Sequence, residues 1–72
     1  MKRITQLRLA RGRTKMKLGA EADVHPARVG QIESGRYVPY EPELRRIARA
    51  LRYQGNPREL LEEVEADGET TP

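Results

Sequence analysis

The 72-residue sequence contains no cysteine, tryptophan or phenylalanine, and it has only three tyrosines. Without cysteine the chain can form no disulfide and no thiolate zinc site, which excludes the disulfide-rich modules of secreted proteins. The core must be built from aliphatic side chains, and with 36% hydrophobic residues it is small. A chain of this length forms one domain that depends on short loops and well-capped helices.

Long apolar runs are also missing, since none approaches the ~20 residues that cross a bilayer. The first residues, MKRITQLRLARGR, contain no hydrophobic signal segment and no cleavage site, so we expect a cytoplasmic location and no membrane partner. The single histidine, His25, has no cysteine or serine partner at a catalytic spacing, and there is no phosphate-binding glycine loop. We therefore expect no enzyme activity, no catalytic residue, no metal and no cofactor.

Basic residues are absent from the end of the chain. Residues 59–72 contain six acidic residues and no basic one, whereas residues 1–36 contain nine Lys or Arg against three Asp or Glu, and residues 37–58 contain five against two. The net charge of +3 thus combines a basic body with an acidic end. A basic body favours a polyanionic partner, although a solvated, arginine-rich surface fits the same charges.

Helical spacing is what the sequence does have. Apolar residues three to four apart predict helices over residues 2–11, 15–22, 26–34 and 42–53, and a fifth over 57–64. No strand pattern occurs. The predicted fold is all-α: a compact five-helix bundle over residues 1–65, followed by an acidic, disordered tail over residues 66–72.

Capping residues mark the ends of these helices. His25 suits the N-cap of the third helix and Pro26 its first position, while Val24 and Val29 occupy the positions of a hydrophobic staple. The other expected helix starts and stops are Gly12, Thr14, Asp23, Gly35 and Gly55, with Asn56, Pro57 and Glu59 opening the fifth helix as a capping box.

The third helix has an unusual outer face. Val29 and Ile32 would face the core, whereas small side chains and one amide would point outward, on a domain otherwise crowded with charge; these are Ala27, Gly30, Gln31 and Ser34. A short helix, a tight turn and a second helix with a clear outer face is the arrangement of a helix-turn-helix.

At these residues the sequence resembles the Cro/CI-type helix-turn-helix domain of phage repressors and their bacterial relatives, also called the XRE family. The resemblance covers residues 4–61 and implies a lambda-repressor-like fold. It also implies that the protein works in a bacterial or phage-infected cell. It is carried by Leu7, Arg8, Gly12, Thr14, Leu18, Val24, Val29, Ile32, Glu33, Gly35, Pro39 and the run from Leu44 to Leu51 that reads L..IA.AL.

The resemblance implies that the segment Pro26–Ser34 is a recognition helix that enters the major groove of DNA. Base contacts would come from Gln31 to adenine, Arg28 to guanine and Ala27 to a thymine methyl group. Contacts to the DNA backbone would come from Thr14, Lys15, His25, Gly30, Ser34, Arg36 and Tyr37. The alternatives are an exposed polar or cationic surface for the long side chains, a core-edge position for Tyr37 and a tolerated glycine at Gly30.

Other positions are expected to be structural. The resemblance implies an ion pair between Arg8 and Glu33 that fixes the angle of the recognition helix. Gly19, where the family usually has alanine, would pack against that helix. Arg13 stands where the family has a leucine, and we expect Met16 to turn inward in its place.

The sequence thus predicts a sequence-specific regulator of transcription, repressor-like, that binds double-stranded DNA as a homodimer on a two-fold operator. Half-sites would lie about one helical turn (~34 Å) apart, with a possible contact to RNA polymerase. The alternative is a small protein-interaction factor with the same fold, either RNA-polymerase-binding or antitoxin-like. The acidic residues of 59–69 favour that alternative, and the basic body favours DNA.

Overall fold

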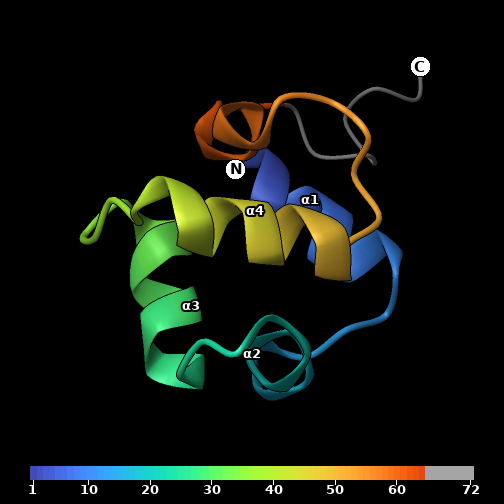
Figure 1. Cartoon of the computed structure of the whole chain (residues 1–72), viewed down its shortest axis with the longest axis vertical. Helices are drawn as coiled ribbons and strands as arrows, with labels where there is room; N and C mark the ends of the chain where they lie inside the picture. The colour runs from blue at the N-terminus through green and yellow to red at the C-terminus, as the bar shows by residue number, and fades with distance from the viewer. Residues whose placement is uncertain (65–72) are drawn as a thin grey trace.

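A computed structural model describes residues 1–64 of the chain. Four α-helices lie around a small core, and a short 3₁₀ helix closes one side (Figure 1). In the described residues there is no strand, only an isolated bridge between Lys2 and Glu63. The elements are α1 (Arg3–Ala10), α2 (Lys15–Ala22), α3 (Pro26–Ser34), α4 (Glu41–Ala50) and η1 (Pro57–Leu61). The all-α prediction is confirmed, and the tail predicted at 66–72 lies outside the described residues.

The caps of α2 and α3 form as predicted. The Thr14 hydroxyl accepts a hydrogen bond from the backbone N–H of Lys17 at 3.0 Å, and Nδ1 of His25 accepts one from the N–H of Ala27 at 3.1 Å. Asp23 ends α2 in the left-handed conformation (φ +59°), and Gly35 ends α3 there (φ +83°). Local sequence therefore determines where α2 and α3 each begin and end.

The predicted end of α4 at Tyr53, with Gly55 as its stop, is wrong. The helix ends at Ala50, Arg52 takes the left-handed conformation (φ +57°), and the N–H of Tyr53 donates to the carbonyl of Ala48 at 2.8 Å. Gly55 serves a different purpose, because a Cβ there would lie 2.6 Å from Glu59 Oε1 and 2.8 Å from the Tyr53 hydroxyl oxygen. It leaves room for the hydrogen bond between those two side chains.

The fifth helix is not an α-helix. The side chain of Asn56 caps η1 as predicted, accepting from the N–H of Arg58 at 2.9 Å, but Glu59 accepts from the Tyr53 hydroxyl. Beyond η1 the chain pairs with the N-terminus: the N–H of Arg3 donates to Glu62 O at 2.8 Å, and the N–H of Val64 donates to Met1 O at 2.7 Å. This long-range pairing requires extended backbone and limits the predicted helix over 57–64 to five residues.

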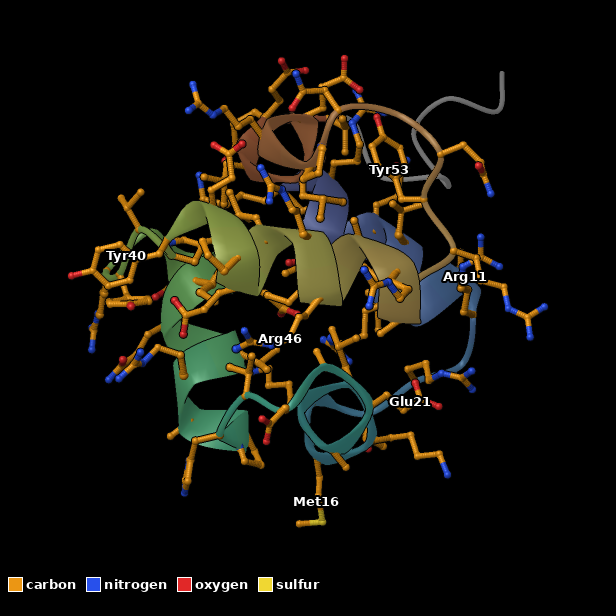
Figure 2. All side chains as sticks on the ribbon, viewed as in Figure 1. Arg11, Met16, Glu21, Tyr40, Arg46 and Tyr53 are labelled. Carbon is orange, nitrogen blue, oxygen red and sulfur yellow. The ribbon has the colours of Figure 1, made fainter. Side chains whose placement is uncertain are left out.

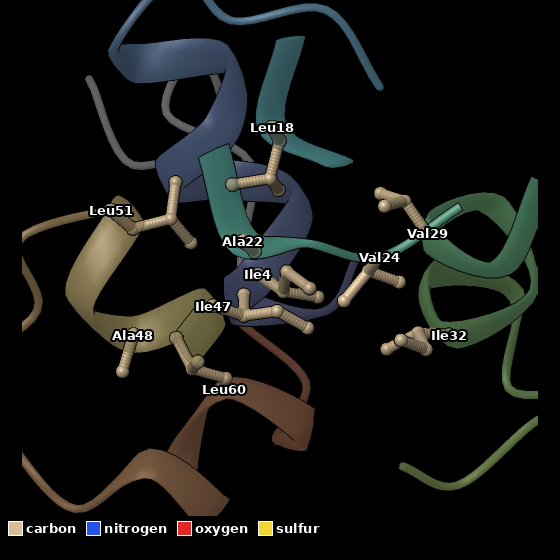
Figure 3. Close-up of a cluster of buried hydrophobic side chains, with 10 residues drawn as sticks. All are labelled: Ile4, Leu18, Ala22, Val24, Val29, Ile32, Ile47, Ala48, Leu51 and Leu60. Atoms are coloured by element: carbon tan, nitrogen blue, oxygen red, sulfur yellow. The ribbon is translucent and has the colours of Figure 1, made fainter. Parts of the chain in front are cut away.

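The core is aliphatic, with side chains from all five elements meeting between them (Figure 3). Its fully buried large side chains are Ile4, Leu18, Val29, Ile32, Ile47, Leu51 and Leu60. The expectation that Met16 turns inward is wrong, since its side chain is 71% exposed and points away from α2 (Figure 2).

Candidate nucleic-acid interface

Helices α2 and α3 meet at a backbone contact that requires glycine. The N–H of Val24 donates to the carbonyl of Gly19 at 2.8 Å. A Cβ at Gly19 would overlap the carbonyl oxygen of Val24 and lie 3.3 Å from the nitrogen of Pro26. Not even the methyl group of alanine fits between α2 and the start of α3, so the packing role predicted for Gly19 is stricter than the sequence indicated.

Arg46 of α4 braces the turn between these two helices. Its Nε donates to the carbonyl of Ala22 at 2.9 Å, and its Nη2 donates to that of Asp23 at 3.5 Å. The side chain lies between α4 and the turn (Figure 2). A cation there satisfies carbonyl groups that α2 leaves unpaired at its end. Sequence analysis missed this residue because the contact spans more than twenty positions and has no local pattern.

Arg8 and Glu33 are brought together across α1 and α3. Arg8 Nε lies 2.7 Å from Glu33 Oε2, and Arg8 Nη2 lies 3.3 Å from Oε1, a two-point contact. The side chains are only 10% and 8% exposed. Arg8 also donates to the backbone carbonyl of Arg13 at 2.8 Å. The pair therefore ties the last turn of α3 to α1 and to the loop before α2.

Arg28 and Tyr37 are engaged with each other and with Glu43. The Arg28 guanidinium lies 4.1 Å from the centre of the Tyr37 ring, and its Nη1 lies 3.3 Å from Glu43 Oε2. The Tyr37 hydroxyl donates to Glu43 Oε1 at 2.9 Å, and the same oxygen accepts from the N–H of Tyr40 at 3.2 Å. Glu43 thus connects α3, the following loop and α4. It is the second residue that sequence analysis missed, although its N3 position in α4 is a capping signal.

Partial burial, together with the hydrogen bond to Glu43, raises the pKa of Tyr37 above 10.0. The neighbouring Arg28 opposes this shift because its charge favours the phenolate. The hydroxyl therefore stays protonated and keeps its bond to Glu43 throughout the neutral range. Tyr37 packs against the core, as one of the two sequence readings had it.

The outer face of α3 is open to solvent. Ala27, Gln31 and Ser34 are exposed, while Val29 and Ile32 on the opposite side are fully buried. Within residues 1–64 the Gln31 side-chain amide has no hydrogen-bond partner, whereas the Ser34 hydroxyl donates to the backbone carbonyl of Gln31 at 3.1 Å. The exposed face of α3 therefore carries the small side chains of Ala27 and Ser34 and, between them, the free amide of Gln31.

Cations and helix N-termini border this face. Lys15, in the first turn of α2, lies beside Gly30, because its Nζ would be 3.7 Å from a Cβ at that glycine. Arg36 is exposed just beyond the end of α3, and the caps Thr14 and His25 are exposed at the starts of α2 and α3. The structure thus places Lys15 beside this face, leaves Thr14, His25 and Arg36 exposed, and turns Arg28 and Tyr37 toward Glu43 of α4.

The described residues contain neither a cluster of metal-binding side chains nor a membrane-spanning helix. No group of three or more His, Cys, Asp or Glu side chains there is arranged to hold a metal ion. None of the helices in residues 1–64 is long and apolar enough to span a membrane.

Comparison with known proteins gives one result that bears on this face. Residues 2–61 match the family described as "Helix-turn-helix domain". The chain belongs to the helix-turn-helix domain family. No curated protein and no solved structure matches it.

Membership in the helix-turn-helix family confirms the motif predicted from the sequence and is consistent with its Cro/CI type. It indicates a DNA-binding regulator, in a family that is generally non-enzymatic. The two helices of the motif in this chain are α2 and α3.

Proposed function

We propose that this helix-turn-helix protein is a sequence-specific regulator of transcription that reads double-stranded DNA with α3 in the major groove. The observation that carries the proposal is the exposed face of Ala27, Gln31 and Ser34, bordered by Lys15 and Arg36. Small side chains let the helix backbone approach the base edges, and the free amide supplies a donor and an acceptor.

Gln31 is the main reader of sequence in this proposal. Its amide matches adenine N6 and N7 as a bidentate pair, and Ala27, one turn earlier on the same face, contacts a thymine methyl group. Arg28 contacts a base only if it first leaves its partners within the protein. To reach guanine O6 and N7 it must leave the Tyr37 ring and the Glu43 carboxylate, so its contribution depends on whether DNA replaces those contacts.

Backbone contacts come from the border of the face. The free N–H groups at the start of α2, together with Thr14 and Lys15, form an anion site. Because Nδ1 of His25 accepts from Ala27, the neutral ring carries its proton on Nε2, where it is able to donate to a phosphate. Gly30, Ser34 and Arg36 complete the border, and Tyr37 acts through Arg28 and the loop.

Regulation follows from occupancy. The protein binds as a homodimer to a two-fold operator, with half-sites about one helical turn (~34 Å) apart, and acts like a repressor by blocking RNA polymerase. A contact with polymerase bound nearby is a further part of the proposal. The regulator works where its DNA is, in the cytoplasm of a bacterial or phage-infected cell.

Selection of bound duplexes from a random pool tests this function. The native protein should enrich one motif, and Gln31→Ala should lose preference at one base position while the others remain. Gln54→Ala, which removes an exposed amide far from α3, is the matched control and should enrich the native motif. No enrichment by the native protein, or a uniform weakening with Gln31→Ala, contradicts direct readout by this residue.

A protein-interaction factor with the same fold is the second candidate. Val38 and Tyr40 are each 73% exposed. Val38 lines a hollow of about 390 Å³ together with apolar residues and the ion pair of Glu41 and Arg58; the apolar residues are Pro39, Leu44 and Leu61. RNA polymerase, or the toxin of an antitoxin-like pair, is the kind of partner this apolar surface fits. Affinity for DNA should fall steeply with salt, whereas an apolar protein contact should change little, so a salt titration separates the two candidates.

A further inference from the structure

The arginine and lysine side chains of this protein divide into paired and unpaired sets. Seven form ion pairs with acidic side chains, and Arg46 donates to backbone carbonyls. Within residues 1–64 the remaining six have neither kind of partner: Arg11, Lys15, Lys17, Arg36, Arg49 and Arg52. Lys15 and Arg36 border α3, and Lys17 lies in the first turn of α2. The other three lie elsewhere, and their arrangement is informative.

These three arginines form a second cationic surface, here called the distal arginine face (Arg11, Arg49 and Arg52). Arg11 and Arg52 line one surface hollow of about 310 Å³ between the end of α1 and the end of α4. Arg49 and Arg52 line a second, of about 440 Å³, between α4 and the loop that leads to η1. Arg52 belongs to both hollows, so the face is continuous.

The distal arginine face lies away from α3. In Figure 1 the N-terminal end of α4 adjoins α3 on the left, while its C-terminal end and the end of α1 lie on the right. Figure 2 shows Arg11 on that right-hand side, pointing outward. α4 has ten residues and therefore spans about 15 Å between the two faces. A duplex seated straight along α3 is not placed to cover these arginines.

Arg52 is an unusual residue for the position that it occupies just after α4. Arg52 has φ +57°, a conformation that glycine adopts with least strain. The protein has Gly12 and Gly35 in that conformation after α1 and α3, and Asp23, a residue that tolerates it better than arginine, after α2. Cations near a helix C-terminus are favoured by the helix dipole, but Arg49 already supplies one in the last turn of α4.

We propose that the distal arginine face binds the phosphate backbone of a second segment of double-stranded DNA, so that one molecule bridges two segments. This inference rests on the proposed function, in which the α3 face holds the first segment. Arg49, in the last turn of α4, and Arg52, just beyond the end of that helix, line the same hollow, and guanidinium groups match phosphates at two points. None of the exposed large hydrophobic side chains among the described residues lines either hollow. The aromatic residue there, Tyr53, is half-buried and bonded to Glu59, so the face offers charge rather than an exposed apolar anchor for a protein.

A capture experiment tests the bridge. A duplex carrying the enriched site is immobilised and saturated with protein, excess protein is washed away, and a labelled duplex without the site is added at low salt. The test variant is Arg11→Ala/Arg49→Ala/Arg52→Gly, in which glycine fits the left-handed backbone, so folding is preserved and is checked by thermal melting. Single-charge comparison uses Arg49→Ala against Arg58→Ala, since Arg58 is exposed but lies outside both hollows.

The native protein should capture the second duplex, and the triple variant should capture about tenfold less or lower still, because each lost phosphate contact weakens binding at a given salt. Binding of the immobilised duplex should be unchanged, and Arg58→Ala should behave like the native protein. Equal capture by the triple variant overturns the proposal, because the second duplex is then held by another surface, such as the α3 of a second protomer. Absence of capture by the native protein overturns it as well.

Failure of the proposed function gives a different result, namely no binding to the immobilised duplex. The distal arginine face is then tested alone, by fluorescence anisotropy with the labelled duplex at low salt. A larger loss of affinity in Arg49→Ala than in Arg58→Ala supports a phosphate-binding face, and equal losses overturn it.

Discussion

At the scale of single residues, two glycines in the helix-turn-helix have opposite roles. A Cβ at Gly19 would overlap the carbonyl oxygen of Val24, whereas a Cβ at Gly30 would make only ordinary contacts with the Lys15 side chain, at 3.7 and 3.8 Å. The family resemblance already implied that Gly19 packs against α3, and it left Gly30 open between a contact to DNA and a tolerated glycine. The structure adds the neighbours themselves, the backbone of Val24 and Pro26 at Gly19 and the Lys15 side chain at Gly30, and so shows how little space Gly19 has.

Alanine at these positions should therefore have opposite effects on stability. Gly19→Ala should lower the free energy of unfolding by about 1–3 kcal/mol, because the packed backbone must shift. Gly30→Ala should raise it by up to about 1 kcal/mol from helix propensity. Chemical denaturation measures both, and a stable Gly19→Ala variant would contradict the packing.

Gly30→Ala also tests how closely α3 approaches DNA. If the backbone of α3 seats against the duplex, the added methyl group should weaken DNA binding even though the protein is more stable. Affinity measured beside the denaturation curve separates the two effects. Unchanged affinity would mean that Gly30 is an exposed glycine with no contact to DNA.

The pair of Arg8 and Glu33 provides a second test at this scale. Both side chains are shielded, so removing either one leaves an uncompensated charge, and each single alanine variant should cost about 3–5 kcal/mol. The double variant should cost less than the sum of the two. A double-mutant cycle measures this coupling, and additive losses would mean that the two groups do not interact in solution.

At the scale of elements, the α-helices with strong local signals and the start of the fifth element were predictable, whereas the type and the end of the fifth element were not. Caps such as Thr14 and His25 act within one turn, so the sequence reveals them. η1 is limited by pairing between residues 62–64 and the N-terminus, and the end of α4 depends on a left-handed arginine where glycine was expected. Contacts between distant positions decided both.

The same reasoning applies to the candidate site. Sequence analysis placed the open face of α3, because its spacing is local. It missed the partners of Arg28, since Tyr37 and Glu43 reach it across a loop, and it missed Arg46 altogether. Recognition residues are visible in a helical pattern, whereas the side chains that orient the helix come from elsewhere in the fold.

Arg46→Ala should loosen the turn between α2 and α3. Losing a charged donor to the carbonyls of Ala22 and Asp23 should cost about 1.5–3 kcal/mol of folding stability. Arg45→Ala is the matched control, because Arg45 makes only an exposed i,i+4 pair with Glu41, worth about 0.3–0.5 kcal/mol. Equal losses in the two variants, measured by chemical denaturation, would show that Arg46 does not brace the turn.

At the scale of the whole molecule, the free energy of unfolding should decrease as the pH rises into the alkaline range. The pKa of Tyr37 is raised chiefly by partial burial, and that of Tyr53 chiefly by its hydrogen bond to Glu59. In the unfolded chain these tyrosines lose their protons near pH 10.0, before they do so in the fold. Their contribution is therefore complete below pH 10.0 and is lost as the pH rises through the higher folded values.

Thermal melting across this range tests the expectation. The melting temperature should fall above pH 10.0, and the fall should be smaller in Tyr37→Phe/Tyr53→Phe, which lacks both ionisable groups. A steeper fall in the double variant would contradict the role given to the two hydroxyls.

In the whole molecule, the cations that stabilise the fold are different from those that are left free on its surface. Paired cations stabilise the fold, as Arg8 and Arg46 do, while unpaired ones gather beside α3 and at the far end of α4. A small aliphatic core supports both surfaces. Of the two surfaces, the exposed face of α3 is the one proposed to meet the major groove.

Purine-methylation interference on a selected duplex tests most directly whether α3 lies in the major groove. Methyl groups on guanine N7 lie in the major groove and those on adenine N3 lie in the minor groove. The account predicts that methylated guanines within each half-site block binding and that methylated adenine N3 positions there do not. Interference confined to adenine N3, or none within the half-sites, would contradict the seating of α3 in the major groove.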